Sequence, residues 1–299
     1  MKVLFPSYYK HFSCIADRCR HSCCIGWEID VDDATMERYR AIGAVGEDIL
    51  SHISGEPASI QLCEGERCPF LDGDGLCKII SSLGEGAVSR ICREHPRFYH
   101  TVRGRTEGGI GAVCEEACRI ILSCDGFDRF VEYERDIEDV EETEFNSIKH
   151  RNYLHLLCFD DILRHSERIL IIREKYEIPD PIYKADEWNK ILSDLEYLDK
   201  SRVGSLTIGK RLADKELEIY LTRFLAYLIF RHVSPATSYD NMRARICFCF
   251  LICEILENTI AEGGHSFEEI VEFARIISEE IEYSEDNTAS LILEMESIV

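Results

Sequence analysis

The residues of this sequence that could do chemistry are its cysteines, fifteen in 299 residues. Four of them, Cys14, Cys19, Cys23 and Cys24, fall within eleven positions. Thiolates are strong, soft ligands that select zinc, copper(I) or iron–sulfur clusters. If the segment from Cys19 to Cys23 is helical, the two sulfurs share one face, because residues four apart are neighbours on a helix. This clustering predicts a metal site.

Later cysteines extend the candidate set. Cys68 and Cys77 flank an Asp-Gly-Asp-Gly sequence, a strong turn signal that brings the two thiols together. The turn is not a calcium-binding EF-hand, because position 12 counted from Asp72 is Leu83 rather than glutamate. The combined spacings match neither the paired C-x2-C knuckles of zinc ribbons nor the cysteine run of bacterial ferredoxins, so the metal stays open between zinc and iron–sulfur.

The remaining cysteines have simpler interpretations. Cys63 stands alone in a polar stretch and is interpreted as an incidental thiol. Cys158, Cys247, Cys249 and Cys253 lie in apolar, helix-like sequence, where free cysteine usually serves as a small core residue. These thiols are not metal-ligand candidates.

Composition limits the classes of partner. The formal net charge of −22 disfavours nucleic acid and anionic membrane surfaces, whereas a lysine-rich protein substrate would be attracted. No apolar run approaches the roughly 20 residues that cross a bilayer, and the first residues lack the apolar stretch of a signal peptide. We therefore expect a cytoplasmic protein with reduced thiols and with no nucleic-acid or membrane partner.

Charge and cysteine content divide the chain near residue 125. Residues 1–125 hold eleven of the fifteen cysteines and 14 basic against 19 acidic residues, a net −5. Residues 126–299 hold 20 basic and 37 acidic residues, a net −17. We predict a cysteine-rich metal-cluster domain over 1–125 and an acidic helical domain over 126–299.

Hydrophobic periodicity and capping signals predict a mainly α fold: an irregular cysteine-rich N-terminal region with a small β-hairpin, then an all-helical region. The hairpin is expected at Phe98–Arg103 and Gly109–Val113. Asp32 or Asp33 is expected to cap a helix, and Ser266 with Glu269 forms a capping box. Helices are predicted over 34–41, 45–53, 79–91, 151–176, 187–198, 214–232, 238–258, 270–281 and 289–298.

A set of motifs occurs in a fixed order over about residues 5–122: Phe12-Ser-Cys14, Cys19 through Trp27, Cys68-Pro-Phe-Leu71, Leu76-Cys77-Lys-Ile79, Leu83-Gly84-Glu85, Cys92-Arg93, Pro96-Arg97 and Cys114-Glu-Glu-Ala117. This ordered set resembles the flagellin lysine-N-methylase family, which is related to a wider group of cysteine-cluster proteins described as zinc or iron chelators. The motifs depart from the family at the last element, where Glu115 replaces the usual proline and Cys118 replaces an alanine.

The resemblance implies an enzyme that methylates lysine side chains of flagellin, or of another lysine-bearing protein, with S-adenosylmethionine as methyl donor. It also implies a 4Fe–4S cluster. Zinc is the alternative metal. The candidate ligands are Cys14, Cys19, Cys23, Cys24, Cys68, Cys77, Cys92 and Cys114. Eight thiols exceed the four that one cluster needs, so either two centres exist or some thiols are structural.

Two further questions stay open at this level. Trp27, Arg97 and Tyr99 lie beside the cysteine motifs and could line a site or simply pack. The alternative function is a non-enzymatic zinc- or iron-binding or redox protein whose helical domain binds a partner. The glycine-rich Gly108–Gly111 segment lies in the predicted hairpin rather than ahead of a helix, so it does not predict a nucleotide-binding loop.

Overall fold

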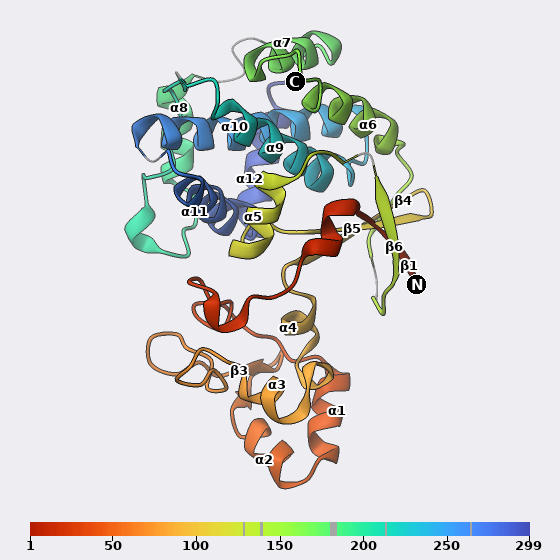
Figure 1. The fold of residues 1–299 in the computed structure, drawn as a ribbon, viewed down its shortest axis with the longest axis vertical. Coiled ribbons are helices and arrows are strands. Elements are labelled where there is room, and N and C mark those ends of the chain that lie inside the picture. Colours follow the sequence, from red (N-terminus) through yellow and green to blue (C-terminus); the bar gives the residue numbers. More distant parts are fainter. Residues whose placement is uncertain (128, 138–139, 180–183, 213, 264) are drawn as a thin grey trace. The chain divides into compact units, whose positions relative to one another are not determined.

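The chain forms two compact units in a computed structural model that describes residues 1–127, 129–137, 140–179, 184–212, 214–263 and 265–299. The helical unit comprises Met1–Phe12 and Phe98–Val299, and the cysteine unit comprises Ser13–Arg97 (Figure 1). These bounds differ from the predicted boundary at residue 125. The difference arises because the first strand and the segment after Arg97 form one sheet, which composition alone does not reveal.

A five-stranded sheet in the helical unit has the order β6 (Phe130–Glu134), β1 (Lys2–Pro6), β5 (Arg105–Ile110), β4 (Arg97–Val102) and β7 (Glu142–Thr143). Strand β1 pairs in parallel with β5, Leu4 opposite Glu107, and antiparallel with β6 over its whole length. The predicted hairpin is confirmed, and its second strand begins four residues earlier than expected. The glycines Gly108 and Gly109 belong to that strand rather than to a nucleotide loop.

The prediction that everything after residue 126 is helical was wrong, because β6 and β7 lie there. Strand β6 has the sequence Phe-Val-Glu-Tyr-Glu, rich in residues that suit a pleated surface. Its backbone partners belong to β1, which precedes the whole cysteine unit in the sequence. Local periodicity could not show that pairing.

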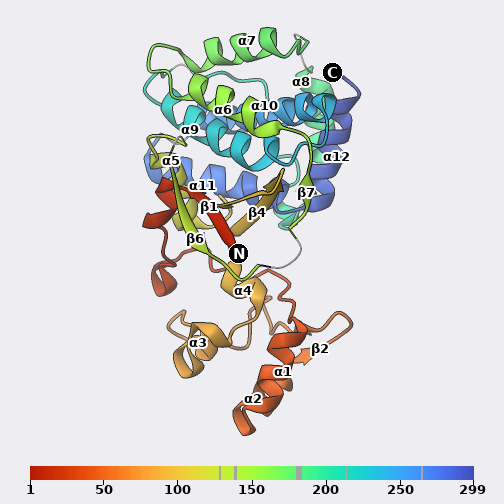
Figure 2. The same ribbon diagram turned by 90° about the vertical axis from the view of Figure 1, so that its right-hand side faces the viewer.

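The helices of the helical unit surround one long buried helix, α10 (Tyr239–Glu262). It packs against α9 (Glu218–Leu228), α11 (Phe267–Ile277) and α12 (Glu285–Glu296). Figure 2 shows α7 (His165–Lys175), α6 (Ser147–Cys158) and α9 in successive layers, and α5 (Glu115–Ser123) packs on α9 and α11. Cys158, Cys247, Cys249 and Cys253 are buried in this core, as predicted. Among the described residues, no helix has the length and apolar character needed to cross a membrane.

Two predicted helices are interrupted by local hydrogen bonds or glycine. The stretch 151–176 forms α6 and α7 around a turn in which Asp160 accepts from the Ile162 N–H at 3.0 Å. Glu167 then accepts from the Arg164 N–H at 2.8 Å and opens α7. The stretch 79–91 forms α3 (Lys78–Leu83) and α4 (Arg90–Glu94), because Gly84 has a φ of +86° that ends α3.

Helices α9 and α11 each continue into a π-helical turn, Ile229–Val233 and Ser278–Glu282. A π turn inserts a residue and shifts the side chains that follow it. The two turns carry His232 and Glu282, whose Nε2 and Oε2 atoms lie 2.8 Å apart in the core. The Tyr227 hydroxyl donates to the same oxygen at 3.0 Å, so a polar network fixes the two helices against each other.

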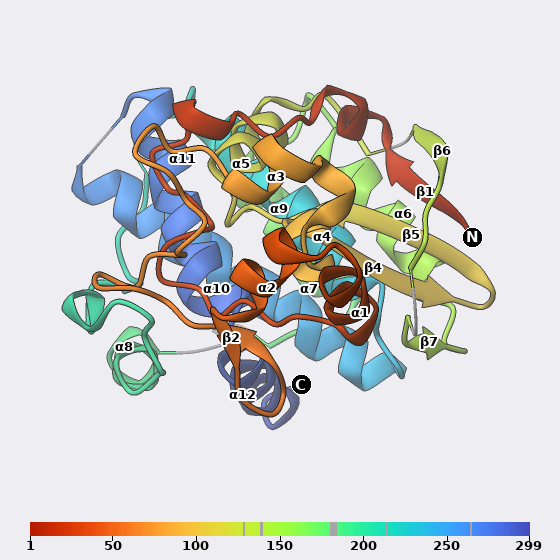
Figure 3. The same cartoon turned by 90° about the horizontal axis from the view of Figure 1, so that it is seen from below.

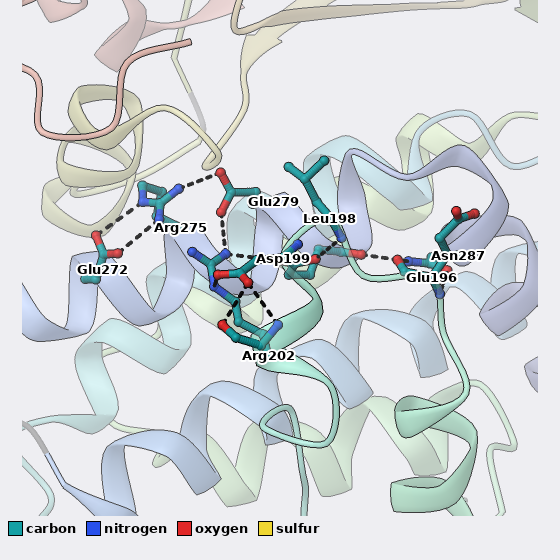
Figure 4. Close-up of polar contacts among 10 residues, drawn as sticks. Glu196, Leu198, Asp199, Arg202, Glu272, Arg275, Glu279 and Asn287 are labelled. Atoms are coloured by element: carbon teal, nitrogen blue, oxygen red, sulfur yellow. Dashed lines mark hydrogen bonds and ion pairs between the residues drawn. The ribbon is translucent and has the colours of Figure 1, made fainter. Parts of the chain in front are cut away.

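The long connection between α8 (Ala185–Ser193) and α9 is held by charged contacts (Figure 4). Arg202 contacts Glu279 at 2.6 Å and Glu280 at 2.9 Å, and Glu280 also accepts the Leu198 N–H at 2.7 Å. Arg275, almost fully buried, pairs with Glu279 at 3.0 Å. These contacts anchor the irregular connection on the π-helical turn that follows α11.

The cysteine unit has a small core of its own, including Ile29, Val31, Tyr39, Ile49 and Phe70. Helices α1 (Asp33–Ala41) and α2 (Ala44–Leu50) lie side by side (Figure 3). A two-stranded ribbon, β2 (Ile53–Ser54) with β3 (Ser59–Ile60), follows them. Most of the cysteines therefore lie in short segments connected by turns, with few long-range hydrophobic contacts.

Asp32, one of the two residues predicted to cap a helix, is the N-cap residue of α1. Its carboxylate accepts from the Thr35 N–H at 3.0 Å and from the Arg90 N–H of α4 at 2.9 Å. Asp32→Ala should destabilise the unit by about 1–2 kcal/mol, since it removes both a helix cap and a tie between helices. Hydrogen exchange of the α1 and α4 amides measures the loss. Asp33→Ala is the control, and equal exchange in the two variants would contradict the assignment.

Candidate functional site

Seven of the eight predicted ligand cysteines lie in the cysteine unit: Cys14, Cys19, Cys23, Cys24, Cys68, Cys77 and Cys92. The eighth, Cys114, lies in the helical unit as the N-cap residue of α5. No disulfide bond forms among the fifteen cysteines, all of which lie in the described part of the chain. The thiols are therefore available as ligands or nucleophiles.

The segment that carries the first four cysteines is not helical. A 3₁₀ turn, Ala16–Arg18, ends at Cys19, which has extended dihedral angles. The Cys19 thiol donates to the His21 carbonyl at 3.3 Å. The condition on which Cys19 and Cys23 would share a helix face is therefore not met. Cys23 and Cys24 instead lie adjacent in a turn.

Backbone pairing joins this segment to the next cysteine motif. The Cys68 N–H donates to the Cys24 carbonyl at 2.8 Å, and Ile25 bridges to Arg67 in antiparallel fashion. The predicted turn after Cys68 is confirmed: the Asp72 carboxylate accepts from the N–H groups of Asp74 and Leu76 at 2.9 and 2.8 Å. These contacts place Cys24, Cys68 and Cys77 on neighbouring segments.

Helices α3 and α4 position the remaining thiols of the unit. Cys77 is the N-cap residue of α3, and Cys92 lies within α4. Burial is the main cause that raises the pKa of Cys92, and the charges of Cys24 and Cys77 raise it further. The hydrogen bond with Cys24 and burial raise the pKa of Cys23, and the charges of Cys24, Cys92 and Cys14 add to this effect. Cys14, Cys23, Cys24, Cys68, Cys77 and Cys92 therefore form one group, which we term the thiol cluster.

The acidities within the thiol cluster are unequal. The hydrogen bond from Cys23, aided by Ser22 and Arg67, outweighs desolvation and lowers the pKa of Cys24 to about 7. The same hydrogen bond, together with desolvation and neighbouring thiols, raises the pKa of Cys23. Desolvation raises the pKa of Cys68 and of Cys92 to about 11. Binding of a metal to the whole cluster must therefore release several protons.

The thiol cluster is a set of neighbouring donors rather than a closed coordination shell. Within the described ranges, no three His, Cys, Asp or Glu side chains converge closely enough to hold a metal ion. The donors are nevertheless soft sulfurs, carried by turns and by the short helices α3 and α4. This chemistry fits a thiolate-ligated metal or cluster whose binding draws the segments together.

Cys114 has different surroundings in the helical unit. The Cys118 N–H donates to the Cys114 carbonyl at 2.8 Å, but the Cys118 side chain is fully buried and its thiol donates to the Val271 carbonyl. Just before Cys114, a Cβ atom on Gly111 would lie 2.1 Å from the Tyr283 hydroxyl. Close backbone packing against Tyr283 therefore requires glycine there.

The three side chains considered as site-lining residues have packing roles. Trp27 lies 6.3 Å from the His95 ring, and an Arg97 Nη1–H donates to the Arg93 carbonyl at 3.1 Å. Tyr99 packs edge-on against Phe5 with ring centroids 6.0 Å apart. These contacts give each residue a place in its own unit, independent of any ligand.

Sequence reasoning missed a buried ionic network and a cavity, both in the helical unit. Glu107 on β5 and Arg151 on α6 are fully buried and form an ion pair, to which His100 adds a contact of 3.2 Å. The cavity, about 670 Å³, is lined by residues from α6, α7, α9 and the end of α5. Its lining is drawn from three separate sequence segments, so no local motif could have shown it.

The fold and the thiol cluster define a mainly α-helical protein with a cysteine-rich unit. The chain belongs to the flagellin lysine-N-methylase family. It is 32% identical over 130 residues to the flagellar biosynthetic protein FliU of Salmonella muenchen, over 40% of this chain and 77% of that protein. Those figures, with the family's ordered cysteine motifs, establish the relationship.

The same stretch matches two proteins named lysine-N-methylase, from Salmonella choleraesuis strain SC-B67 and Salmonella typhimurium strain LT2. Each is 32% identical over 130 residues, and the match covers 40% of this chain but only 32% of each relative. The matched chain thus spans about a third of the length of these two relatives. No protein-family model and no solved structure matches this chain.

Proposed function

We propose that this protein transfers methyl groups from S-adenosylmethionine to lysine side chains of flagellin or of another lysine-bearing protein. The observation that supports the proposal is the 32% identity to proteins named lysine-N-methylase and to a flagellar biosynthetic protein. The acidic surface, with a formal net charge of −22, favours a lysine-rich protein substrate by electrostatic attraction.

The reaction requires a neutral lysine amine. The amine loses its proton to a base, and its lone pair attacks the methyl carbon of the sulfonium. The carbon–sulfur bond breaks, and sulfur keeps the electron pair as a thioether, S-adenosylhomocysteine. An enzyme accelerates this step mainly by holding nitrogen, carbon and sulfur in line, since correct orientation removes much of the entropic barrier.

We also propose that the thiol cluster holds a 4Fe–4S cluster through four of its cysteines, with zinc as the alternative metal. When bound, such a cluster supplies Lewis-acidic iron and cross-links the chain segments that provide its ligands. The chain's own contribution is the low pKa of Cys24 and the turn that brings Cys68 and Cys77 together. Cys19 and Cys114 remain candidates by family resemblance.

The test is methyl transfer by anaerobically purified full-length protein from methyl-labelled S-adenosylmethionine to purified flagellin. We expect label on flagellin lysines. Flagellin whose lysines have been acetylated is the matched control, because acetylation removes the nucleophilic amine, and it should gain no label. Equal labelling of both substrates, or no labelling of either, would overturn the methyltransferase proposal. Metal binding without methyl transfer would favour the non-enzymatic alternative.

A further inference from the structure

The cavity in the helical unit has the features of a small-molecule site. It lies where α6, α7 and α9 pack together beside the end of α5. Its volume of about 670 Å³ is within the range of roughly 300–1,000 Å³ typical of ligand pockets. Cys124 and Cys158 form buried parts of the wall, and the turn from Asp161 to Arg164 forms part of its lining.

Most charged groups of the cavity are satisfied by the protein itself. Arg164 pairs with Glu218, and Arg223 contacts Asp125 at 3.1 Å. The buried Arg168 donates to the carbonyls of Leu157 and Asp160 and to the Thr222 hydroxyl. These contacts leave little free charge on the inner walls.

Two lining groups of opposite sign remain available. Lys215 and Asp161 are exposed, and neither forms an ion pair within the part of the chain that the structure describes. One free cation and one free anion on the same cavity suit a zwitterion, such as an amino acid with its carboxylate and ammonium groups. A substrate lysine side chain fits this cavity less well, because the lining has four basic and three acidic side chains in total.

The cavity also presents apolar surface to solvent. Ile162 is 90% exposed and Ile219 is 46% exposed, although both line the cavity, and Phe159 beside them is half-buried. Leaving such side chains in water forgoes about 1.5–3 kcal/mol each, which a ligand with an apolar planar face could recover. A ligand with an amino-acid end and an aromatic end would match both features.

We propose that this cavity binds the methyl donor. The inference rests on the proposed methyltransferase function, and it assigns the donor site to the helical unit. Lys215 contacts the donor's carboxylate and Asp161 its ammonium group. The adenine lies against Phe159, Ile162 and Ile219. The donor is thus held by residues far in sequence from the cysteine motifs.

The test is isothermal titration calorimetry of the full-length protein with S-adenosylhomocysteine, which has the donor's amino-acid and adenosine parts. Ile162→Asp and Lys215→Glu change exposed residues, so folding should be retained. We expect one saturable site, with binding weakened about tenfold or more in each variant. Leu156→Asp is the matched control, a 72% exposed leucine on α6 outside the cavity, and should bind as the unchanged protein does. Amide exchange at residues 159–168 should slow in the presence of the ligand.

Other outcomes separate this inference from the proposed function. Equal binding by the unchanged protein and both cavity variants, or no binding by any of them, would overturn the cavity as the donor site. Methylation by the unchanged protein could then still be measured, and its presence would uphold the proposed function alone. Binding that depends on the cavity, together with no methylation of flagellin, would uphold the site and overturn the proposed function.

Discussion

Cys24→Ser should reduce the iron and sulfide of anaerobically purified protein to less than about a tenth of the unchanged protein's content. Changes to residues that only support a metal ligand typically cost about 10–100-fold in metal affinity, and loss of a ligand should cost at least as much. Cys24 is the strongest candidate because the hydrogen bond from Cys23 lowers its pKa and because its carbonyl accepts from the Cys68 N–H, which places it beside the second cysteine motif. Metal analysis and absorbance near 400 nm, about the region of thiolate-to-iron transitions, measure the effect.

Cys63→Ser is the matched control for this experiment. Cys63 is an exposed thiol of the same unit and lies outside the motifs that carry the candidate ligands. Its replacement should leave iron, sulfide and methyl transfer unchanged. A Cys24→Ser protein with full metal content would remove Cys24 from the ligand set. Stoichiometric zinc in a colourless unchanged protein would replace the iron–sulfur proposal with a zinc site.

Arg151→Met should destabilise the helical unit by up to about 3–5 kcal/mol, since it removes the buried counter-charge of Glu107 and leaves the part-exposed Arg105, whose Nε lies 2.7 Å from Glu107 Oε1. Both side chains are fully buried, and Arg151 also donates to Ser234 Oγ at 3.1 Å. Urea denaturation followed by circular dichroism measures the loss. Lys149→Met changes an exposed cation on the same helix and should have little effect. A loss below about 1 kcal/mol in Arg151→Met would contradict this account.

The same ion pair predicts how stability depends on pH. Burial alone would raise the pKa of Glu107, but the His100 hydrogen bond and the Arg151 charge outweigh it and lower the pKa to about 2. The ordinary value is 4.5, so the pair contributes its full stability above about pH 4.5 and loses it as the pH falls toward 2. In Arg151→Met the folded-state pKa of Glu107 should rise toward its ordinary value, so this acid-dependent loss should become smaller or disappear.

Features determined by local chemistry were predictable from the sequence. The Asp32 cap, the Ser266–Glu269 capping box and the turn at Asp72 each depend on side chains within a few residues of the backbone groups that they satisfy. The buried cysteines of α10 were predictable because residues 246–253 form an unbroken apolar stretch. The mainly α class follows from the same helical periodicity.

Features determined by distant contacts were not predictable. The β6 strand depends on β1, and the Glu107–Arg151 pair joins a strand to a helix that follows it much later. The donor cavity depends on Asp161, Lys215 and the end of α5 meeting in space. In the thiol cluster, the motifs identified the candidate ligands, but the neighbourhood of Cys24 and Cys92 is a property of the fold.

The arrangement of β1 has a consequence for biosynthesis. This strand is translated before the cysteine unit, and its partners β5 and β6 are translated only after the whole of that unit. Because pairing between segments distant in sequence is slow and exposes strand edges, the nascent chain presents β1 unpaired for an extended period. The cysteine unit has all its residues in one continuous segment, so it can fold during that interval. Metal loading and early chaperone contact would then act on a nascent chain in which residues 98–299 of the helical unit have not yet been translated.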